Sequence, residues 1–230
     1  LREKVAGSRL SGAPALGHTR WATHGPPTEE NAHPHQVGPV VVVHNGIFEN
    51  ASELREELAR SGVAFRSDTD TEVFAALVAR ALPESKNLAE AVGKALLEVH
   101  GAFSIVVGSE TEPETLVGAR WGCPLVAGKG AEKGETFFAS DIPAILSHTR
   151  EIFMIEDGEM AVATPAGLSF QDFSGKLLSR AATNISWDPV SAEKGGYRHF
   201  MLKEIHEQPT ALVNTLGAWF DAAKGRTTLD

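Results

Sequence analysis

The order of hydrophobic patterns along this chain constrains its fold more than any other feature. A β-branched run at 37–46 predicts a strand that meets a tight turn at Asn45-Gly46. Three amphipathic helical patterns follow, at 50–62, 69–82 and 88–101. From residue 102 onward, short apolar runs alternate with glycine, proline and charged residues, which indicates closely spaced strands. This order is typical of an α+β fold with mostly antiparallel sheet.

Local signals predict where several of these elements begin and end. Asn50 can cap the first helix, Thr69 and Glu72 have the spacing of a capping box at the second, and Gly101 closes the third. The segment 63–67 predicts a short strand. From about Ser174 the apolar pattern weakens, and we expect a tail or linker that leads elsewhere.

Composition excludes several classes of partner. The net charge of −9 repels phosphate backbones, so we expect no nucleic-acid partner. No apolar run approaches the roughly 20 residues that span a bilayer, and no signal peptide opens the chain, so we expect no membrane partner. Cys123 is the only cysteine and cannot form an internal disulfide, which favours a reducing cytoplasm.

The residues 17–35, which we call the polar segment, are rich in histidine and hydroxyl side chains. His33 and His35 form a His-x-His pair that could hold zinc, but no catalytic zinc signature matches the spacing, and we expect neither a metal nor a cofactor. We expect these two histidines to fasten a long loop to its scaffold instead. Arg20, with Thr23 and His24 nearby, could either lie on the surface or grip a carboxylate by a two-pronged bond.

Two further positions each have a simple and a functional interpretation. Asn45-Gly46 is a common turn pair, but an Asn amide and a Gly N–H can also stabilise one negative oxygen. Asp70 can favour the positive end of a helix, or it can bind an ammonium group. Arg20 for a carboxylate and Asp70 for an ammonium group would together describe a pocket for an α-amino acid.

Several motifs in the same order resemble the glutaminase domain of the class II glutamine amidotransferases. They are HTRWATHG, NAHPH, HNGIFEN and SDTDTEV, at 18–25, 31–35, 44–50 and 67–73. More narrowly, GGYRHFMLKEIHEQP (195–209) resembles the tail that joins glutaminase to sugar isomerase in glutamine–fructose-6-phosphate aminotransferases. The resemblance runs from about Gly17 to Pro209.

The resemblance implies an N-terminal-nucleophile sandwich, with two antiparallel sheets between helical layers. It implies hydrolysis of the side-chain amide of L-glutamine. The ammonia would pass to an isomerase domain that converts fructose 6-phosphate to glucosamine 6-phosphate, in a protein that we expect to be a homodimer. The implied substrate-binding residues are Arg20, Trp21, Thr23, His24 and Asp70, and the implied oxyanion hole consists of Asn45 and Gly46. The implied domains are a glutaminase at 1–194 and a linker at 195–230 toward the isomerase.

One feature departs from the family pattern. The family's nucleophile is a cysteine at the mature N-terminus, whereas this chain begins with Leu1, and Cys123 lies in a strand-like setting far from any terminus. We expect that the first strand, helix and strand lie upstream of Leu1, and that the fragment by itself is inactive. Two alternatives stay open: a non-catalytic glutamine-binding domain, and a histidine-rich metal-dependent hydrolase.

Overall fold

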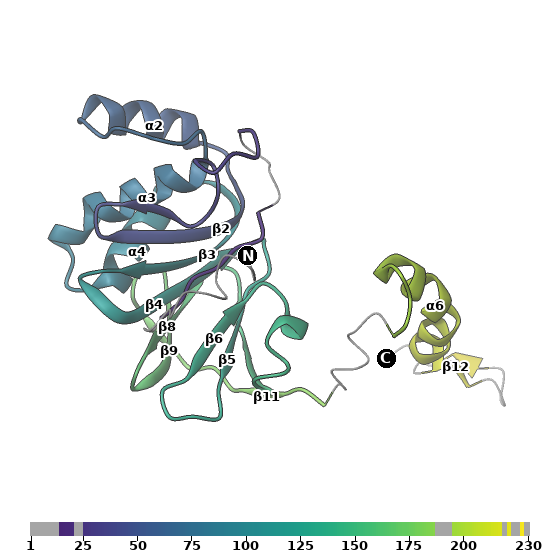
Figure 1. Cartoon of the computed structure of the whole chain (residues 1–230). Coiled ribbons are helices and arrows are strands. Elements are labelled where there is room, and N and C mark those ends of the chain that lie inside the picture. Colours follow the sequence, from purple (N-terminus) through teal and green to yellow (C-terminus); the bar gives the residue numbers. More distant parts are fainter. Residues whose placement is uncertain (1–13, 21–24, 187–194, 218–219, 222–225, 228–230) are drawn as a thin grey trace, which may run out of the picture. The chain divides into compact units, whose positions relative to one another are not determined.

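The computed structural model describes residues 14–20, 25–186, 195–217, 220–221 and 226–227. The chain forms two compact units, Leu1–Ile185 (unit 1) and Ser186–Asp230 (unit 2). Unit 1 contains two antiparallel sheets and the helices that cover one of them (Figure 1). Within the described residues, no helix is both long enough and apolar enough to cross a membrane.

The larger sheet of unit 1 has seven strands in the order β1-β2-β3-β4-β8-β9-β10. The strands are β1 (His35–Val37), β2 (Val40–Phe48), β3 (Gly101–Ser109), β4 (Glu112–Trp121), β8 (Glu159–Thr164), β9 (Gly167–Asp172) and β10 (Leu177–Leu178). The smaller sheet has the order β11-β7-β5-β6. Its strands are β5 (Val126–Lys129), β6 (Thr136–Ala139), β7 (Glu151–Met154) and β11 (Thr183–Asn184). All neighbouring strands are antiparallel, as the sequence predicted.

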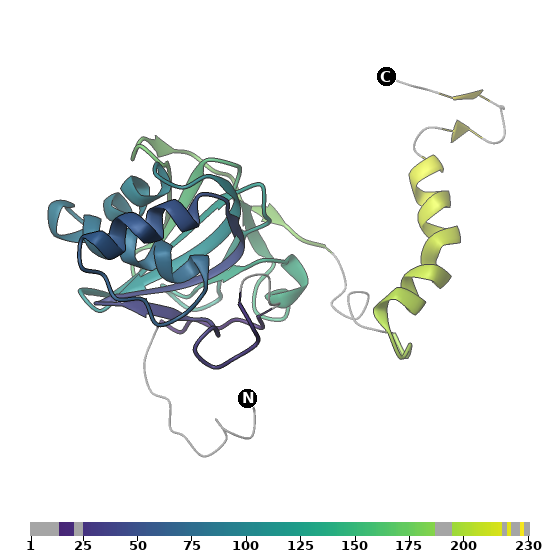
Figure 2. The same ribbon diagram turned by 90° about the horizontal axis from the view of Figure 1, so that it is seen from above.

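The helices of unit 1 lie on the outer face of the seven-stranded sheet, as the view from above shows (Figure 2). They are α2 (Ala51–Arg60), α3 (Asp70–Ala81) and α4 (Leu88–Leu96), with the short 3₁₀ turn η1 (Leu82–Glu84). Helix α3 is the most deeply placed, since every residue from Asp70 to Val78 is buried. Its apolar side chains form the largest core cluster together with one face of β2 and β3. Packing of this buried helix on the sheet therefore determines the position of its first residue, Asp70, relative to β2.

Two smaller clusters complete unit 1. One lies between the two sheets and includes Val43, Val106 and Ala127. The other lies on the opposite face of the smaller sheet and includes Val126 and Ile152, against the segment that contains the 3₁₀ turn η2 (Ile142–Ala144). Neighbouring residues such as Val126 and Ala127 belong to different clusters because successive side chains of a strand point to opposite faces.

Unit 2 contains α6 (Phe200–Gly217) and a hairpin of β12 (Phe220–Asp221) and β13 (Arg226–Thr227). From the sequence we expected a tail or linker here and not a helix. Pro209 lies inside it, and a proline removes one helical hydrogen bond and normally ends a helical pattern. The Tyr197 ring stacks on the His206 ring, with centroids 5.3 Å apart, which ties the start of the unit to the helix.

Four local predictions were wrong. Asn45-Gly46 is not a turn, because β2 continues through Phe48. The segment 63–67 is not a strand. The third helix ends at Leu96, and Gly101 begins β3. Asn50 precedes α2, but its side chain makes no cap and instead bonds the Glu98 carbonyl and the His100 N–H.

Candidate active site

Asn45 and Gly46 lie in the second half of β2, paired with β3. Asn45 is opposite Ser104, and Gly46 is opposite Phe103. Gly46 has φ of +120°, and a Cβ atom placed there would lie 2.1 Å from the Ala102 carbonyl oxygen. Any larger residue would collide with backbone, so the close approach of the two strands requires glycine at this position.

Asp70 is the first residue of α3 and is only 5% exposed. Its Oδ2 accepts a hydrogen bond of 2.9 Å from the backbone N–H of Phe48, two residues beyond Gly46. Its Oδ1 lies 3.8 Å from Nδ1 of His44, the residue before Asn45. The carboxylate of Asp70 is therefore held against the same stretch of β2 that carries Asn45 and Gly46.

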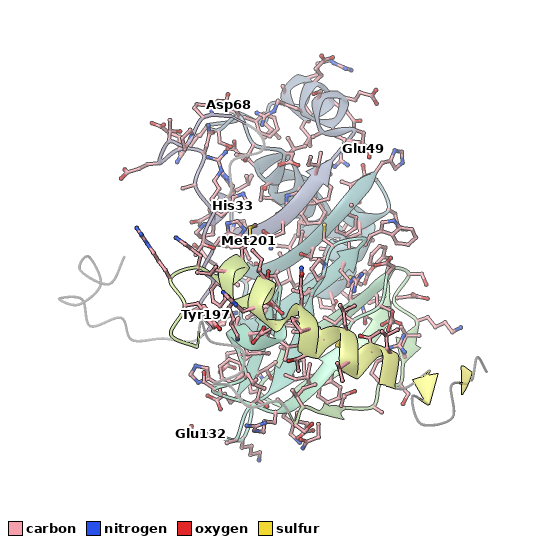
Figure 3. The ribbon with its side chains drawn as sticks, turned by 90° about the vertical axis from the view of Figure 1, so that its right-hand side faces the viewer. His33, Glu49, Asp68, Glu132, Tyr197 and Met201 are labelled. Atoms are coloured by element: carbon pink, nitrogen blue, oxygen red, sulfur yellow. The ribbon has the colours of Figure 1, made fainter. Side chains whose placement is uncertain are left out.

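Arg20 is connected to the loop before α3 through backbone carbonyls of the polar segment. Its guanidinium donates to Pro26 O at 2.9 Å and to Gly25 O at 3.3 Å. Asn31 donates to the same Pro26 oxygen at 3.1 Å, and its Oδ1 accepts from the Asp68 N–H at 2.9 Å. Asp68 is two residues before Asp70. Figure 3 shows Asp68 and His33 on the same side of unit 1.

Threonine hydroxyls at the start of α3, from the N-cap Thr69 and from Thr71, contact two histidines of the polar segment. Nε2 of His35 lies 3.0 Å from Thr69 Oγ1. Nε2 of His33 lies 3.0 Å from Thr71 Oγ1, and the same hydroxyl lies 3.0 Å from Nδ1 of His44. The two histidines of the His-x-His pair thus fasten the loop, as predicted. Thr71, which joins that loop to β2, was not among the predicted residues.

Burial disfavours the charged form of the His33 and His35 imidazoles. Burial is the largest cause that lowers the pKa of His33 to about 3, and electrostatic repulsion by the neighbouring imidazoles acts in the same direction. Burial likewise lowers the pKa of His35, although the nearby Glu72 carboxylate opposes this shift. Among the described residues, no three His, Cys, Asp or Glu side chains are grouped so that they could hold a metal ion.

Two cavities border these residues. A cavity of about 400 Å³ lies between the two sheets, with polar side chains of His18, Asn45 and Ser104 in its lining. The Oγ of Ser104 is buried there and has no hydrogen-bond partner among the described residues. A smaller cavity of about 110 Å³ is lined in part by Phe48, Arg55 and Asp70. Asn45 thus lines the larger of these two cavities, and Asp70 lines the smaller one.

The structure brings together four of the predicted site residues. Asp70 contacts His44 and Phe48, which flank Asn45 and Gly46 in β2. Arg20 is connected to the loop before α3 through the carbonyl of Pro26 and the side chain of Asn31. The other predicted substrate-binding residues, Trp21, Thr23 and His24, lie outside the described residues.

Cys123 lies apart from this group in the chain and has the character of a weak nucleophile. It is half-buried, and burial raises the pKa of its thiol above the usual value. A thiol rather than a thiolate is therefore the main species at neutral pH, and the thiolate is the reactive form. This supports the expectation that Cys123 has a structural role.

Residues 18–147 match the family described as "Glutamine amidotransferase domain". This match covers more than half of the chain and contains Arg20, Asn45, Gly46 and Asp70. The chain belongs to the glutamine amidotransferase domain family. The resemblance that the ordered motifs indicated is thereby confirmed.

The chain is also similar to curated proteins named "Glutamine--fructose-6-phosphate aminotransferase [isomerizing]". The protein of Aquifex aeolicus is 52% identical over 203 residues, which are 87% of this chain and 34% of the relative. The protein of Symbiobacterium thermophilum is 47% identical over 230 residues, which are 99% of this chain and 37% of the relative. The chain thus spans about a third of the length of these relatives.

Solved structures support the same fold. The glutamine phosphoribosylpyrophosphate amidotransferase of B. subtilis, complexed with ADP and GMP, superimposes with a TM-score of 0.58 at 26% identity, over 70% of this chain and 35% of that chain. A structure described as the allosteric regulatory enzyme of purine biosynthesis gives 0.57 at 27% identity, over 68% of this chain and 34% of that chain. Unit 1 therefore has the α+β fold of the N-terminal-nucleophile amidotransferases, as predicted.

Proposed function

We propose that this chain is the glutaminase part of a glutamine–fructose-6-phosphate aminotransferase. In this function it hydrolyses the side-chain amide of L-glutamine to glutamate and ammonia. The ammonia then serves an isomerase domain that converts fructose 6-phosphate to glucosamine 6-phosphate. The names of the relatives that match nearly the whole chain support this substrate pair. We place the enzyme in the cytoplasm and propose that it is a homodimer.

One observation carries the proposal more than the others. The Asp70 carboxylate accepts from the Phe48 N–H at 2.9 Å and so lies beside the Asn45–Gly46 stretch of β2. A negative group that can bind an ammonium ion is thereby held against the strand that carries Asn45 and Gly46, whose N–H groups can stabilise a negative oxygen. An amino acid with a carboxamide side chain has a matching arrangement, with an ammonium group at one end and an amide at the other.

The proposed roles follow from the chemistry of amide hydrolysis. A nucleophile that attacks the amide carbon pushes the carbonyl electron pair onto oxygen. The Asn45 carboxamide and the Gly46 N–H stabilise the resulting negative charge. Arg20 binds the α-carboxylate with its guanidinium, Thr23 and His24 assist it, and Asp70 binds the α-ammonium group. Trp21 belongs to a loop that closes over the substrate. Cys123 does not act as the cysteine nucleophile that the family resemblance implies.

Unit 2 fits a role as a connection to the sugar isomerase. Its helix α6 exposes Phe200, Met201 and Ile205, and also Leu212 and Leu216. We propose that residues 195–230 form the link toward that domain and that 1–194 form the glutaminase.

The function can be tested with purified full-length protein. Glutamine should yield glutamate and ammonia, and addition of fructose 6-phosphate should yield glucosamine 6-phosphate. Asp70→Asn keeps an oxygen that can accept from the Phe48 N–H but removes the charge. A charged hydrogen bond contributes about 1.5–3 kcal/mol, so KM for glutamine should rise about 10- to 100-fold.

A substrate analogue separates loss of the ammonium contact from damage to the fold. With N-acetylglutamine, which has no ammonium group, the wild type and Asp70→Asn should have similar KM values. Asp172→Asn, at the end of β9, is the matched control and should leave KM for both substrates unchanged. Glutamine binding without release of glutamate would instead indicate a non-catalytic glutamine-binding domain.

A further inference from the structure

The side-chain amide of Asn45 can take two orientations that differ by a half turn. Its oxygen and nitrogen are similar in size, so a neighbouring hydrogen bond decides which of them faces a ligand. Only the NH2 orientation can donate to a negative oxygen. The orientation of this one exposed amide therefore determines whether the site has one oxyanion donor or two.

His18 is the neighbour that decides this orientation. Its Nε2 lies 2.9 Å from Asn45 Oδ1. Because a carboxamide oxygen only accepts, this contact requires a hydrogen on Nε2 of His18. The two hydrogens on Asn45 Nδ2 then point away from His18.

The other ring nitrogen of His18 favours the same arrangement. If Asn45 were reversed, its NH2 would donate to Nε2, and the hydrogen of a neutral His18 ring would have to be on Nδ1. Nδ1 is buried and has no hydrogen-bond partner among the described residues. A buried N–H without an acceptor costs about 1–3 kcal/mol, and unpaired acceptors are better tolerated than unpaired donors. The unpartnered nitrogen therefore disfavours the reversed amide.

Contacts on both sides of His18 hold its ring in place. The ring lies against the His33 ring with centroids 4.3 Å apart. Two residues earlier, Leu16 packs against the cluster between the sheets. Two residues later, Arg20 donates to the carbonyls of Gly25 and Pro26. His18 is thus fastened to the core, to the polar segment and to Asn45.

We infer that His18 is a positioning residue that holds the Asn45 amide with its NH2 group toward the oxygen of the substrate amide. The inference rests on the proposed glutaminase function and adds to it a residue that does not touch the substrate. An oxyanion donor is effective when it is oriented before the reaction, and the His18 contact provides this orientation.

A pair of substitutions of nearly equal size tests the inference in the full-length enzyme. His18→Gln keeps an N–H donor for Asn45 Oδ1, and we expect its kcat to stay within about 3-fold of the wild type. His18→Glu is acceptor-only when ionised and would turn the Asn45 NH2 group toward itself. We expect its kcat to fall about 10²-fold, near the loss of one oxyanion donor, with a small change in KM. His18→Leu, which lacks both donor and charge, should also lower kcat.

The Asn45→Ala background distinguishes positioning from a structural role. Without the amide there is nothing for residue 18 to orient, so the kcat ratio of His18→Gln to His18→Glu should shrink to about 3 or less. A ratio that stays large in this background would overturn the inference, because the effect would then come from charge or folding. Circular dichroism of each variant checks the fold, and His18→Leu tests the donor if His18→Glu does not fold.

The outcomes for the inference and for the proposed function are distinct. His100 is exposed, and His100→Leu should leave kcat unchanged. A wild type that hydrolyses glutamine, together with equal kcat values for His18→Gln and His18→Glu, would overturn the role of His18 alone. A wild type that releases no glutamate would overturn the proposed function and, with it, the inference.

Discussion

At the scale of single residues, Asn45 has the most direct link to the proposed chemistry. It is exposed, lines the cavity between the sheets, and is held by His18 at 2.9 Å. Asn45→Ala should lower kcat for glutamine hydrolysis about 10²- to 10³-fold, because the lost donor acts on charge that develops in the transition state. KM should change little. Steady-state release of glutamate from the full-length protein measures both constants.

A matched asparagine provides the control for this prediction. Asn184 is exposed and lies in β11 of the smaller sheet, so Asn184→Ala should leave both constants unchanged. A large rise in KM with an unchanged kcat for Asn45→Ala would mean that Asn45 binds the ground state and does not stabilise an oxyanion.

The sequence identified Asn45 and Gly46 by residue type but could not predict their backbone. Asn-Gly is a common turn pair, and local propensity alone favours a turn. The pairing of β2 with β3 prevails, because Gly46 lies so close to Ala102 that only glycine fits. That contact joins residues more than 50 positions apart, so no local pattern contains it. His18 was missed as a partner of Asn45 for the same reason.

At the scale of elements, the start of α3 determines where Asp70 lies. Only one of the two hydrogen bonds of the predicted capping box forms. The Thr69 hydroxyl accepts from the Glu72 N–H at 3.3 Å, as predicted. The Glu72 carboxylate, however, accepts from the N–H groups of Arg66 and Ser67 and from the Ser67 hydroxyl. These contacts also explain why 63–67 is not a strand, since its last two N–H groups are bound by a side chain.

Removal of the Glu72 carboxylate should therefore destabilise the protein through this loop. Glu72 is buried, and Glu72→Ala leaves the buried Ser67 N–H and its neighbours without their acceptor. The free energy of unfolding should fall by about 2–4 kcal/mol, at about 1–3 kcal/mol for each unsatisfied buried group. Denaturant unfolding followed by circular dichroism measures the change.

Glu53 offers a matched control in the first turn of another helix. It is exposed near the start of α2, so Glu53→Ala should change the free energy of unfolding by less than about 0.5 kcal/mol. If the two substitutions lowered the free energy of unfolding equally, helix electrostatics would explain the effect of Glu72→Ala. The hydrogen bonds from Arg66 and Ser67 to Glu72 would then not be its cause.

At the scale of the whole molecule, the polar segment is held against the start of α3 by the imidazoles of His33 and His35. The sequence predicted that His33 and His35 are structural, and their contacts with Thr71 and Thr69 agree with this. Their partners could not be predicted, because His33 and Thr71 are 38 positions apart and meet only when α3 packs on the sheet. The antiparallel sheets were predictable because alternating short strands leave few other ways to bury their apolar faces.

The attachment through His33 predicts how stability depends on pH. Burial lowers the pKa of His33 from 6.5 to about 3 in the folded protein. Above about pH 6.5 the ring is neutral in both states, so it causes no pH dependence there. As the pH falls from about 6.5 toward 3, the unfolded chain binds a proton that the folded protein does not bind, so folding becomes less favourable. His33→Gln removes this titration and keeps an amide N–H that can reach Thr71.

Unfolding midpoints in urea between pH 7 and pH 4 would measure the effect on the full-length protein. The wild-type midpoint should fall more steeply over this range than that of His33→Gln, and the two slopes should converge above pH 6.5. Exposed His100 is the control, because His100→Gln should leave the wild-type profile unchanged. Parallel profiles for the wild type and His33→Gln would show that His33 accepts a proton in the folded state. The polar segment would then release or rearrange its contact with Thr71 in mild acid.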